Sequence, residues 1–314
     1  MKKIIYLSIL CLVISACVSK YEVVLPDTPK TLVINGYLTN NISDSAGIQI
    51  SQAVSTLSQD WPAPDATGAV VALFENGTKV KTLFLNQIGS NNLGFTTNGF
   101  MPKAGKTYRV EAKFKDFDAV SAEQVMPTDM PIFTARYRDS ISFANGGGTR
   151  GGSSNAIAGV DISFVDNGST TDYYEIQVYT QDSIDTNGDG INDVLSPPIQ
   201  RSIEPFNNVG ESVGSIGSGS SLLLSDQTFN GQRISFSVLS YELRYGYNYY
   251  NPGAIPKRSV RLTHITQDRY LYLKSKLKQD QSGVGLLVEP VYVYSNVSNK
   301  FGIFLLGNGR LQDL

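Results

Sequence analysis

Apolar and polar residues alternate in short runs along most of the chain after residue 30. Residues 31–38, 107–114 and 173–180 are three of these runs, and Gly, Pro, Asn and Asp separate them from their neighbours. Alternation with a period of two is typical of strands that bury one face, and the separating residues favour turns. The pattern therefore predicts an all-β protein of the sandwich type, because βαβ units would place long helical segments between the strands.

Two pairs of runs stand close enough together to form hairpins. Residues 69–74 and 79–85 flank Glu75-Asn76-Gly77-Thr78, in which Asn-Gly can adopt the positive φ angles of a tight turn. Residues 107–114 and 119–125 flank a second polar loop. We therefore expect two hairpins in the first half of the chain.

Two prolines interrupt the alternation within residues 126–131. Proline lacks the N–H group that a strand ladder needs, so this segment favours a domain boundary. We expect two β-sandwich (Ig-like) domains, an N-terminal one at residues 31–128 and a C-terminal β-rich one at residues 129–314. Strands are expected near residues 133–142 and 232–245 of the second domain.

Only one segment of the second domain has helical periodicity. Near residues 267–278 the apolar side chains of Tyr270, Leu273 and Leu277 recur on one face, and Thr266 can cap the first turn. We expect one short helix here that packs against the strands of the domain.

The start of the chain has the pattern of a secretion signal. Lys2 and Lys3 precede a mostly apolar stretch, residues 4–14, which is too short to span a bilayer. Residues 1–16 are therefore predicted to be a signal peptide that is removed on export.

A lipid anchor is predicted directly after this signal. Ile14-Ser15-Ala16-Cys17 resembles the lipobox of bacterial lipoproteins, with isoleucine where leucine is commoner. We expect Cys17 to become the lipid-carrying first residue and residues 17–30 to form a tether to the membrane. The alternative is an ordinary cleaved signal followed by a cysteine that has no such role.

Composition narrows the class of protein further. Besides Cys17 the sequence contains only Cys11, which lies within the expected signal, so the mature chain can form no internal disulfide. The 26 basic and 28 acidic residues show no basic cluster of the kind that binds nucleic acid. With 41% hydrophobic residues, the chain is too polar for an integral membrane protein.

Several stretches together indicate a known family. They are residues 32–39, 68–71, 105–108, 225–231, 289–297 and 301–304. Their order resembles Bacteroidota outer-membrane lipoproteins known as domain of unknown function 4249, often encoded beside TonB-dependent receptors. The resemblance covers nearly the whole mature chain. It implies a protein lipid-anchored at the outer membrane, on either the periplasmic or the exposed face, with a TonB-dependent receptor as partner. It implies no activity and no catalytic residues.

Two residues within these stretches have structural explanations. Gly36 lies inside a strand run, where glycine marks a bulge or a close approach of two backbones. Asn296 precedes an apolar C-terminal strand, where its side chain is expected to form a turn or a bridge.

Motifs for enzymatic chemistry are scarce. The one histidine, His264, shares strand parity with Val260 and Leu262, so we expect a partly buried side chain with its hydrogen bonds satisfied. The sequence contains no H-E-x-x-H or P-loop motif. We therefore expect a non-enzymatic binding protein that assists outer-membrane transport. A carboxylate-dependent glycoside hydrolase and a purely structural envelope lipoprotein are the alternatives.

Residues 185–193 have the ligand spacing of a calcium loop, with glycine at the sixth position. The expected Ca²⁺ ligands are the side chains of Asp185, Asn187, Asp189 and Asp193 and the backbone carbonyl of Ile191. Ser196 replaces the bidentate glutamate of the twelfth position, so the expected affinity is weak, on the order of 10⁻⁴ to 10⁻³ M. The alternative is a solvated turn between two strands.

Tyrosine is dense in residues 241–250. Its ring offers rigid contact area with a polar end, which suits a surface that binds a partner or stacks on a glycan. The residues expected to form such a surface are Tyr245, Tyr247, Tyr249 and Tyr250. The alternative is a set of strand aromatics that pack on their cross-strand neighbours.

Overall fold

The computed structural model describes residues 30–40, 47–54, 60, 62–97, 99–141, 157–184, 194–206, 209–214, 220–243, 256–282 and 291–314. Within these ranges the chain is mostly β, with several sheets and one α-helix, which confirms the predicted all-β sandwich class. No α-helix in the described ranges is both long enough and apolar enough to cross a membrane.

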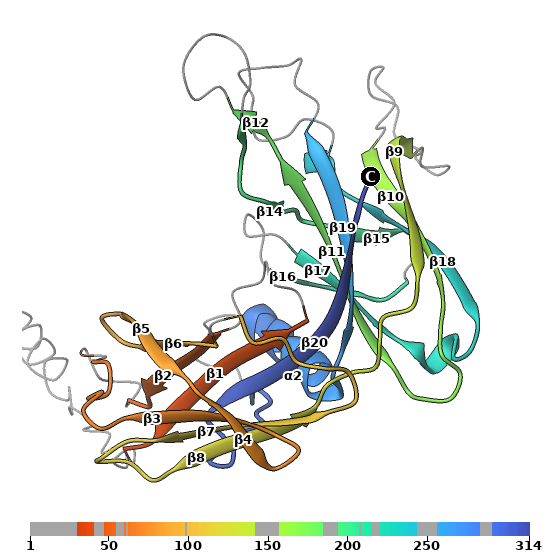
Figure 1. Cartoon of the computed structure of the whole chain (residues 1–314). Helices are drawn as coiled ribbons and strands as arrows, with labels where there is room; N and C mark the ends of the chain where they lie inside the picture. Colours follow the sequence, from red (N-terminus) through yellow and green to blue (C-terminus); the bar gives the residue numbers. More distant parts are fainter. Residues whose placement is uncertain are drawn as a thin grey trace, which may run out of the picture.

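The largest sheet runs through the whole molecule (Figure 1). Its strands are β1 (Leu32–Thr39), β2 (Gly47–Gln52), β5 (Phe84–Ile88), β6 (Leu93–Thr96), β11 (Tyr173–Gln181), β14 (Ile199–Gln200), β16 (Glu211–Gly214), β17 (Ser220–Ser225), β19 (Lys257–Ile265) and β20 (Gly302–Asp313). Their order is β16-β17-β11-β19-β20-β1-β2-β6-β5, and β14 pairs with β11.

Two four-stranded sheets cover the two halves of the large sheet. One has the order β4-β3-β7-β8 and the other β15-β18-β10-β9. Their strands are β3 (Val70–Glu75), β4 (Thr78–Thr82), β7 (Thr107–Lys113) and β8 (Val120–Val125), then β9 (Phe133–Ile141), β10 (Ile157–Val165), β15 (Glu204–Phe206) and β18 (Arg233–Leu239). A small ribbon pairs β12 (Ser183–Ile184) with β13 (Val194–Leu195).

Each four-stranded sheet encloses its own hydrophobic core. The core of the first sandwich joins β1, β2, β6 and β20 to β3, β7 and β8, and that of the second joins β11, β17 and β19 to β9, β10 and β18. Along the chain, the first core continues to Met126 and the second begins at Met130, on either side of the boundary predicted after residue 128. The C-terminal segment returns to the first core, to which it contributes Val297, Phe304 and Leu306.

Strand β20 connects the two sandwiches (dark blue in Figure 1). Its first residues pair in parallel with β1, and its later residues, from Gly307, pair antiparallel with β19. Gly36 lies at the parallel pairing, where an added Cβ would come within 2.5 Å of Ile48 and 3.0 Å of Phe304. Both neighbours are side-chain atoms, and the pairing of β1 has no register shift, so Gly36 makes room for two side chains rather than for a bulge or a second backbone.

Both predicted hairpins form. Asn76 and Gly77 have positive φ angles of 48° and 80° between β3 and β4, and β7 pairs antiparallel with β8. The run at residues 79–85 is not one strand, because the buried Leu83 separates β4 from β5, which belongs to the other sheet. The strand expected at residues 232–245 is also shorter. It ends at Leu239, where Ser240 Oγ accepts the Glu242 N–H and starts the 3₁₀ turn η2 (Tyr241–Leu243).

The predicted helix is present as α2 (Gln267–Ser282). Thr266 Oγ1 accepts the N–H of Arg269 at 3.3 Å, so the expected cap is in place. Tyr270, Leu273 and Leu277 pack against Leu223 and Ile265, which confirms that this face is the packing face.

Candidate functional site

Three sites predicted from the sequence lie outside the described residues. They are the lipidation site Cys17, the calcium loop at residues 185–193, and the tyrosines 245, 247, 249 and 250. Each of them stays a prediction.

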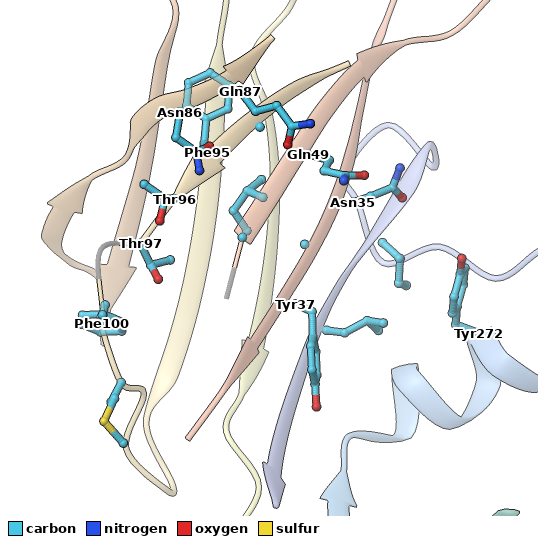
Figure 2. Close-up of a pocket in the computed structure, with 18 residues that line it drawn as sticks. Asn35, Tyr37, Gln49, Asn86, Gln87, Phe95, Thr96, Thr97, Phe100 and Tyr272 are labelled. Carbon is cyan, nitrogen blue, oxygen red and sulfur yellow. The ribbon is translucent and has the colours of Figure 1, made fainter. Parts of the chain in front are cut away.

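A hollow of about 530 Å³ lies on the face of the first sandwich that points away from its core (Figure 2). The strands beneath it alternate in burial: Ile34, Ile48 and Ile50 enter the core, whereas Asn35 and Gln49 point outward. Its volume falls within the range of about 300–1,000 Å³ that is usual for ligand pockets. We call this feature the amide hollow.

Strand register aligns the floor of the amide hollow in a row across five strands. Asn35 of β1 stands opposite Gln49 of β2, and it is also paired with Ile303 of β20. Gln49 in turn pairs with Gly94 of β6, and Gly94 with Gln87 of β5. Three amide side chains therefore follow one line across the sheet, with a fourth, Asn86, in the bulge between Leu85 and Gln87.

Glycines in the middle of the floor account for its depth. Gly94 separates the amides of Gln49 and Gln87, and in the neighbouring row Gly47 separates Tyr37 from Thr96. A Cβ added at Gly94 would lie 3.1 Å from the Gln87 side chain and 3.3 Å from Asn86 Oδ1. A side chain at this position would therefore fill space that the amides now surround.

Aromatic side chains form the walls. Asn35 and Gln49 lie between Gln87 on one side and Tyr272 of α2 on the other (Figure 2). Phe100 forms a further wall and packs edge-on against the buried Tyr108, with ring centroids 5.8 Å apart. These rings lend the hollow rigid apolar contact area beside its amides.

A buried ion pair holds Tyr37 at the end of the floor. The guanidinium of Arg269 lies 4.2 Å from the centre of the Tyr37 ring and contacts Glu175 Oε2 at 2.6 Å. Burial alone lowers the pKa of Arg269, but the adjacent Glu175 carboxylate outweighs it and holds the pKa above its ordinary value. The guanidinium is therefore a fixed positive charge behind the tyrosine ring.

The amide hollow itself is uncharged. Its described lining residues include no Asp, Glu, Lys, Arg or His. Within the described part of the chain, the side chains of Asn35, Gln49, Asn86 and Gln87 make no hydrogen bond to one another or to other residues. Each amide thus keeps an acceptor oxygen and two N–H donors for a ligand.

His264 is buried in the second sandwich, as the sequence predicts, and its ring nitrogens have partners. Its Nε2 lies 3.1 Å from Asp172 Oδ1, and its Nδ1 lies 3.2 Å from the carbonyl oxygen of Thr128. Both ring nitrogens therefore lie within hydrogen-bond distance of an oxygen. The histidine is remote from the amide hollow, whose lining does not include it.

Asn296 bridges two elements, as expected. Its amide nitrogen donates to the carbonyl oxygen of Phe304 and to Asp268 Oδ2, and its oxygen accepts the Phe304 N–H. It therefore fastens the start of β20 to the beginning of α2.

The amide hollow is not among the sites predicted from the sequence. A signal was available: asparagine is depleted in strands, yet Asn35 occupies an outward position in a run of strong strand formers. The amides that stand beside Asn35 are set by the register of the neighbouring strands. The local sequence pattern does not predict that register.

Comparison with known proteins identifies one family. The family model described as "Domain of unknown function (DUF4249)" matches residues 18–310, nearly the whole chain. A comparison with the curated proteins finds no match.

Proposed function

We propose that this chain, which belongs to the DUF4249 family, is a lipid-anchored, non-enzymatic binding protein of the outer membrane. It holds a neutral, hydroxyl-rich ligand, of which an oligosaccharide is the model case, in the amide hollow. It presents this ligand to a TonB-dependent receptor. The observation that carries the proposal is the line of free amides across an uncharged floor with aromatic walls.

The chemistry of the floor favours hydroxyl groups. An amide can donate to and accept from a hydroxyl at the same time, and Asn35, Gln49 and Gln87 repeat this capacity along one line. A charged ligand would lose hydration without gaining a counter-charge, which disfavours it. An extended peptide is less suitable, because such a peptide pairs its backbone with a strand edge, whereas Asn35 and Gln49 stand on strands β1 and β2, which are paired on both sides.

The geometry argues against hydrolysis of the ligand at this place. A glycoside hydrolase uses two carboxyl groups on either side of the scissile bond. The described lining of the amide hollow provides none. A protein that binds the sugar and releases it unchanged fits this lining better than a hydrolase does.

The N-terminal pattern supports membrane attachment. The signal at residues 1–16 and the lipobox ending at Cys17 have the layout of exported lipoproteins. Acyl chains on Cys17 would keep the hollow close to the membrane, and the family resemblance suggests a TonB-dependent receptor as the protein that receives the ligand.

Binding is tested by calorimetric titration of the full chain in detergent with a panel of neutral and acidic oligosaccharides. We expect binding of a neutral member and a loss of roughly 10-fold in affinity in Gln49→Leu, the effect of about one hydrogen bond. Gln279→Leu is the matched control, because Gln279 is an exposed amide on α2 outside the hollow. Binding of acidic sugars or of peptides alone would contradict the proposed ligand class.

The anchor and the partner are tested separately. Cys17→Ser is expected to release the protein from membranes, since the lipid is its attachment. Affinity purification of the wild-type protein from solubilised membranes is expected to recover a TonB-dependent receptor. Retention of Cys17→Ser on membranes after a high-salt wash would refute the anchor.

A further inference from the structure

Three aspartates meet at one end of the second sandwich. Asp166 follows β10, Asp172 precedes β11, and Asp226 begins the 3₁₀ turn η1 (Asp226–Thr228) after β17. One carboxylate oxygen from each lies within 4.8 Å of those of the other two. Their residues are only 5%, 4% and 1% exposed, respectively. We call these three residues the aspartate cluster.

Strand pairing explains why they converge. Tyr173 pairs with Ser225 in the large sheet, so the next positions outward, Asp172 and Asp226, stand opposite each other. Asp172 N–H donates to Asp226 Oδ2 at 2.8 Å, and Asp226 N–H donates to the Asp172 carbonyl oxygen at 3.1 Å. Asp166 comes from the covering sheet, so the cluster lies where the two sheets of the sandwich meet.

Five of the six carboxylate oxygens have protein partners. Asp166 accepts from the Tyr174 hydroxyl and the Gly231 N–H, and Asp172 accepts from Thr170 Oγ1 and contacts His264 Nε2. Asp226 Oδ2 accepts the Asp172 N–H. These contacts fix the orientation of all three carboxylates.

The sixth oxygen, Asp226 Oδ1, is buried and has no hydrogen-bond partner in the structure. Leaving a buried carboxylate oxygen without a donor costs the folded state its full desolvation penalty. The carboxylates also have no Lys or Arg partner among the described residues, and the one ion-pair contact in the cluster is that of Asp172 with the His264 ring. The site therefore lacks both a partner for Oδ1 and positive charge.

We propose that Asp166, Asp172 and Asp226 bind one Ca²⁺ ion. The ion supplies the partner of Asp226 Oδ1 and the missing positive charge. Ligand oxygens lie about 2.3–2.6 Å from a bound Ca²⁺, so oxygens on opposite sides of it are about 5 Å apart, which matches the cluster. An all-carboxylate set is hard, and the burial of the cluster disfavours Mg²⁺, which retains several waters.

A second cavity provides access for the ion. It has a volume of about 600 Å³, and its lining includes Asp172, Thr170 and His264 together with Thr128 from the segment that connects the two sandwiches. The ion joins three elements of the second sandwich. It is also linked indirectly to the connecting segment, because its ligand Asp172 contacts His264 and His264 in turn contacts Thr128. Its role is structural and is independent of the ligand of the amide hollow.

The metal is measured on the full chain in detergent, first as purified and then after stripping with EDTA. We expect one Ca²⁺ per chain bound at the aspartate cluster. This ion is separate from any Ca²⁺ held by the predicted loop at residues 185–193. Restoring Ca²⁺ at about 100 times its Kd should raise the melting temperature by roughly 5–10 °C. Tb³⁺ should replace the ion and emit when tyrosine is excited, because the Tyr174 hydroxyl bonds to Asp166.

Two variants separate the aspartate cluster from the loop. Asp226→Asn keeps the size of the side chain and should abolish the Ca²⁺-dependent melting shift and the Tb³⁺ emission. Asp185→Ala/Asp189→Ala should keep both. If Asp226→Asn does not fold, retention of one tightly bound Ca²⁺ by the Asp185→Ala/Asp189→Ala protein still supports the site. No bound metal and no shift in the wild-type protein, or a shift lost only in the loop variant, would overturn it.

Discussion

The two sandwiches share one large sheet but place their polar side chains in opposite ways. The first exposes uncharged amides such as Asn35 and Gln49 on the outer face of its sheet. The second buries the carboxylates of Asp166, Asp172 and Asp226 where its two sheets meet. Exposed amides lose little hydration and remain free for a ligand, whereas buried carboxylates need partners before the protein can fold around them.

This difference separates recognition from stability. The amides of the hollow, on Asn35, Gln49, Asn86 and Gln87, can change at little cost to the fold, because these four side chains make no hydrogen bond within the described structure. The side chains of the aspartate cluster cannot be changed without a cost to the fold, since each carboxylate holds a strand end or turn in place. Four substitutions probe the comparison, starting with the largest expected effect.

Phe304→Ala should destabilise the protein by about 4 kcal/mol, the usual cost of removing a buried phenylalanine. Phe304 is fully buried in the first core and lies on β20, the strand that connects both sandwiches. Loss of this contact should therefore lower the unfolding temperature of both halves together. Thermal unfolding followed separately by tyrosine fluorescence and far-ultraviolet circular dichroism measures this, and two separate transitions in the variant would show that β20 does not couple the halves.

Arg269→Met should cost about 3 kcal/mol, because it leaves the buried Glu175 carboxylate without its cation. It should also weaken ligand binding, since Arg269 supports the ring of Tyr37 at the hollow. Glu175→Gln/Arg269→Met removes both charges and should recover much of the stability. If the double variant is no more stable than Arg269→Met, the ion pair is not the source of the loss.

Gly94→Val should reduce ligand affinity by roughly 10-fold or more, which corresponds to about 1.4 kcal/mol of binding free energy. It should change the stability of the protein little. Its side chain would occupy the floor between Gln49 and Gln87. Calorimetric titration and a melting curve on the same sample separate the two effects. Unchanged affinity would place the ligand elsewhere.

Tyr108→Phe should have the smallest effect, about 1 kcal/mol at neutral pH. The Tyr108 hydroxyl donates to Glu75 and accepts the Lys103 N–H. Burial raises its pKa to about 12, and the Glu75 carboxylate adds to the rise, although the Lys103 N–H opposes it. In the unfolded chain the Tyr108 hydroxyl ionises near pH 10. Its contribution to the free energy of unfolding is therefore complete below about pH 10 and is lost as the pH rises toward 12.

Urea unfolding of the wild-type protein and Tyr108→Phe at intervals between about pH 8 and pH 11 checks this dependence. The difference in stability between the two proteins should shrink as the pH rises. A difference that stays constant would mean that the hydroxyl does not titrate differently in the folded and unfolded states.

Local signals in the sequence predicted the elements whose causes are local. Asn76-Gly77 specified a turn, and Thr266 with the spacing of Tyr270, Leu273 and Leu277 specified helix α2. The burial of His264 followed from strand parity. In each case the residues that determine the structure lie within a few positions of one another.

The pairing of distant strands could not be predicted in this way. The parallel pairing of β20 with β1 joins the two ends of the chain, and no local pattern encodes it. The amide row depends on the register of five strands. The aspartate cluster combines residues 166 and 172 with residue 226, which lies in a stretch noted only for its family resemblance.

Calorimetric titration of Gln49→Leu and Asp226→Asn, each with both Ca²⁺ and the neutral oligosaccharide, tests most directly whether the two sandwiches divide recognition from stability. Gln49→Leu should lose roughly 10-fold in sugar affinity and keep wild-type Ca²⁺ binding. Asp226→Asn should lose Ca²⁺ and keep the sugar affinity at a temperature where it stays folded. Loss of both ligands in either variant would contradict the division, as would a loss of neither.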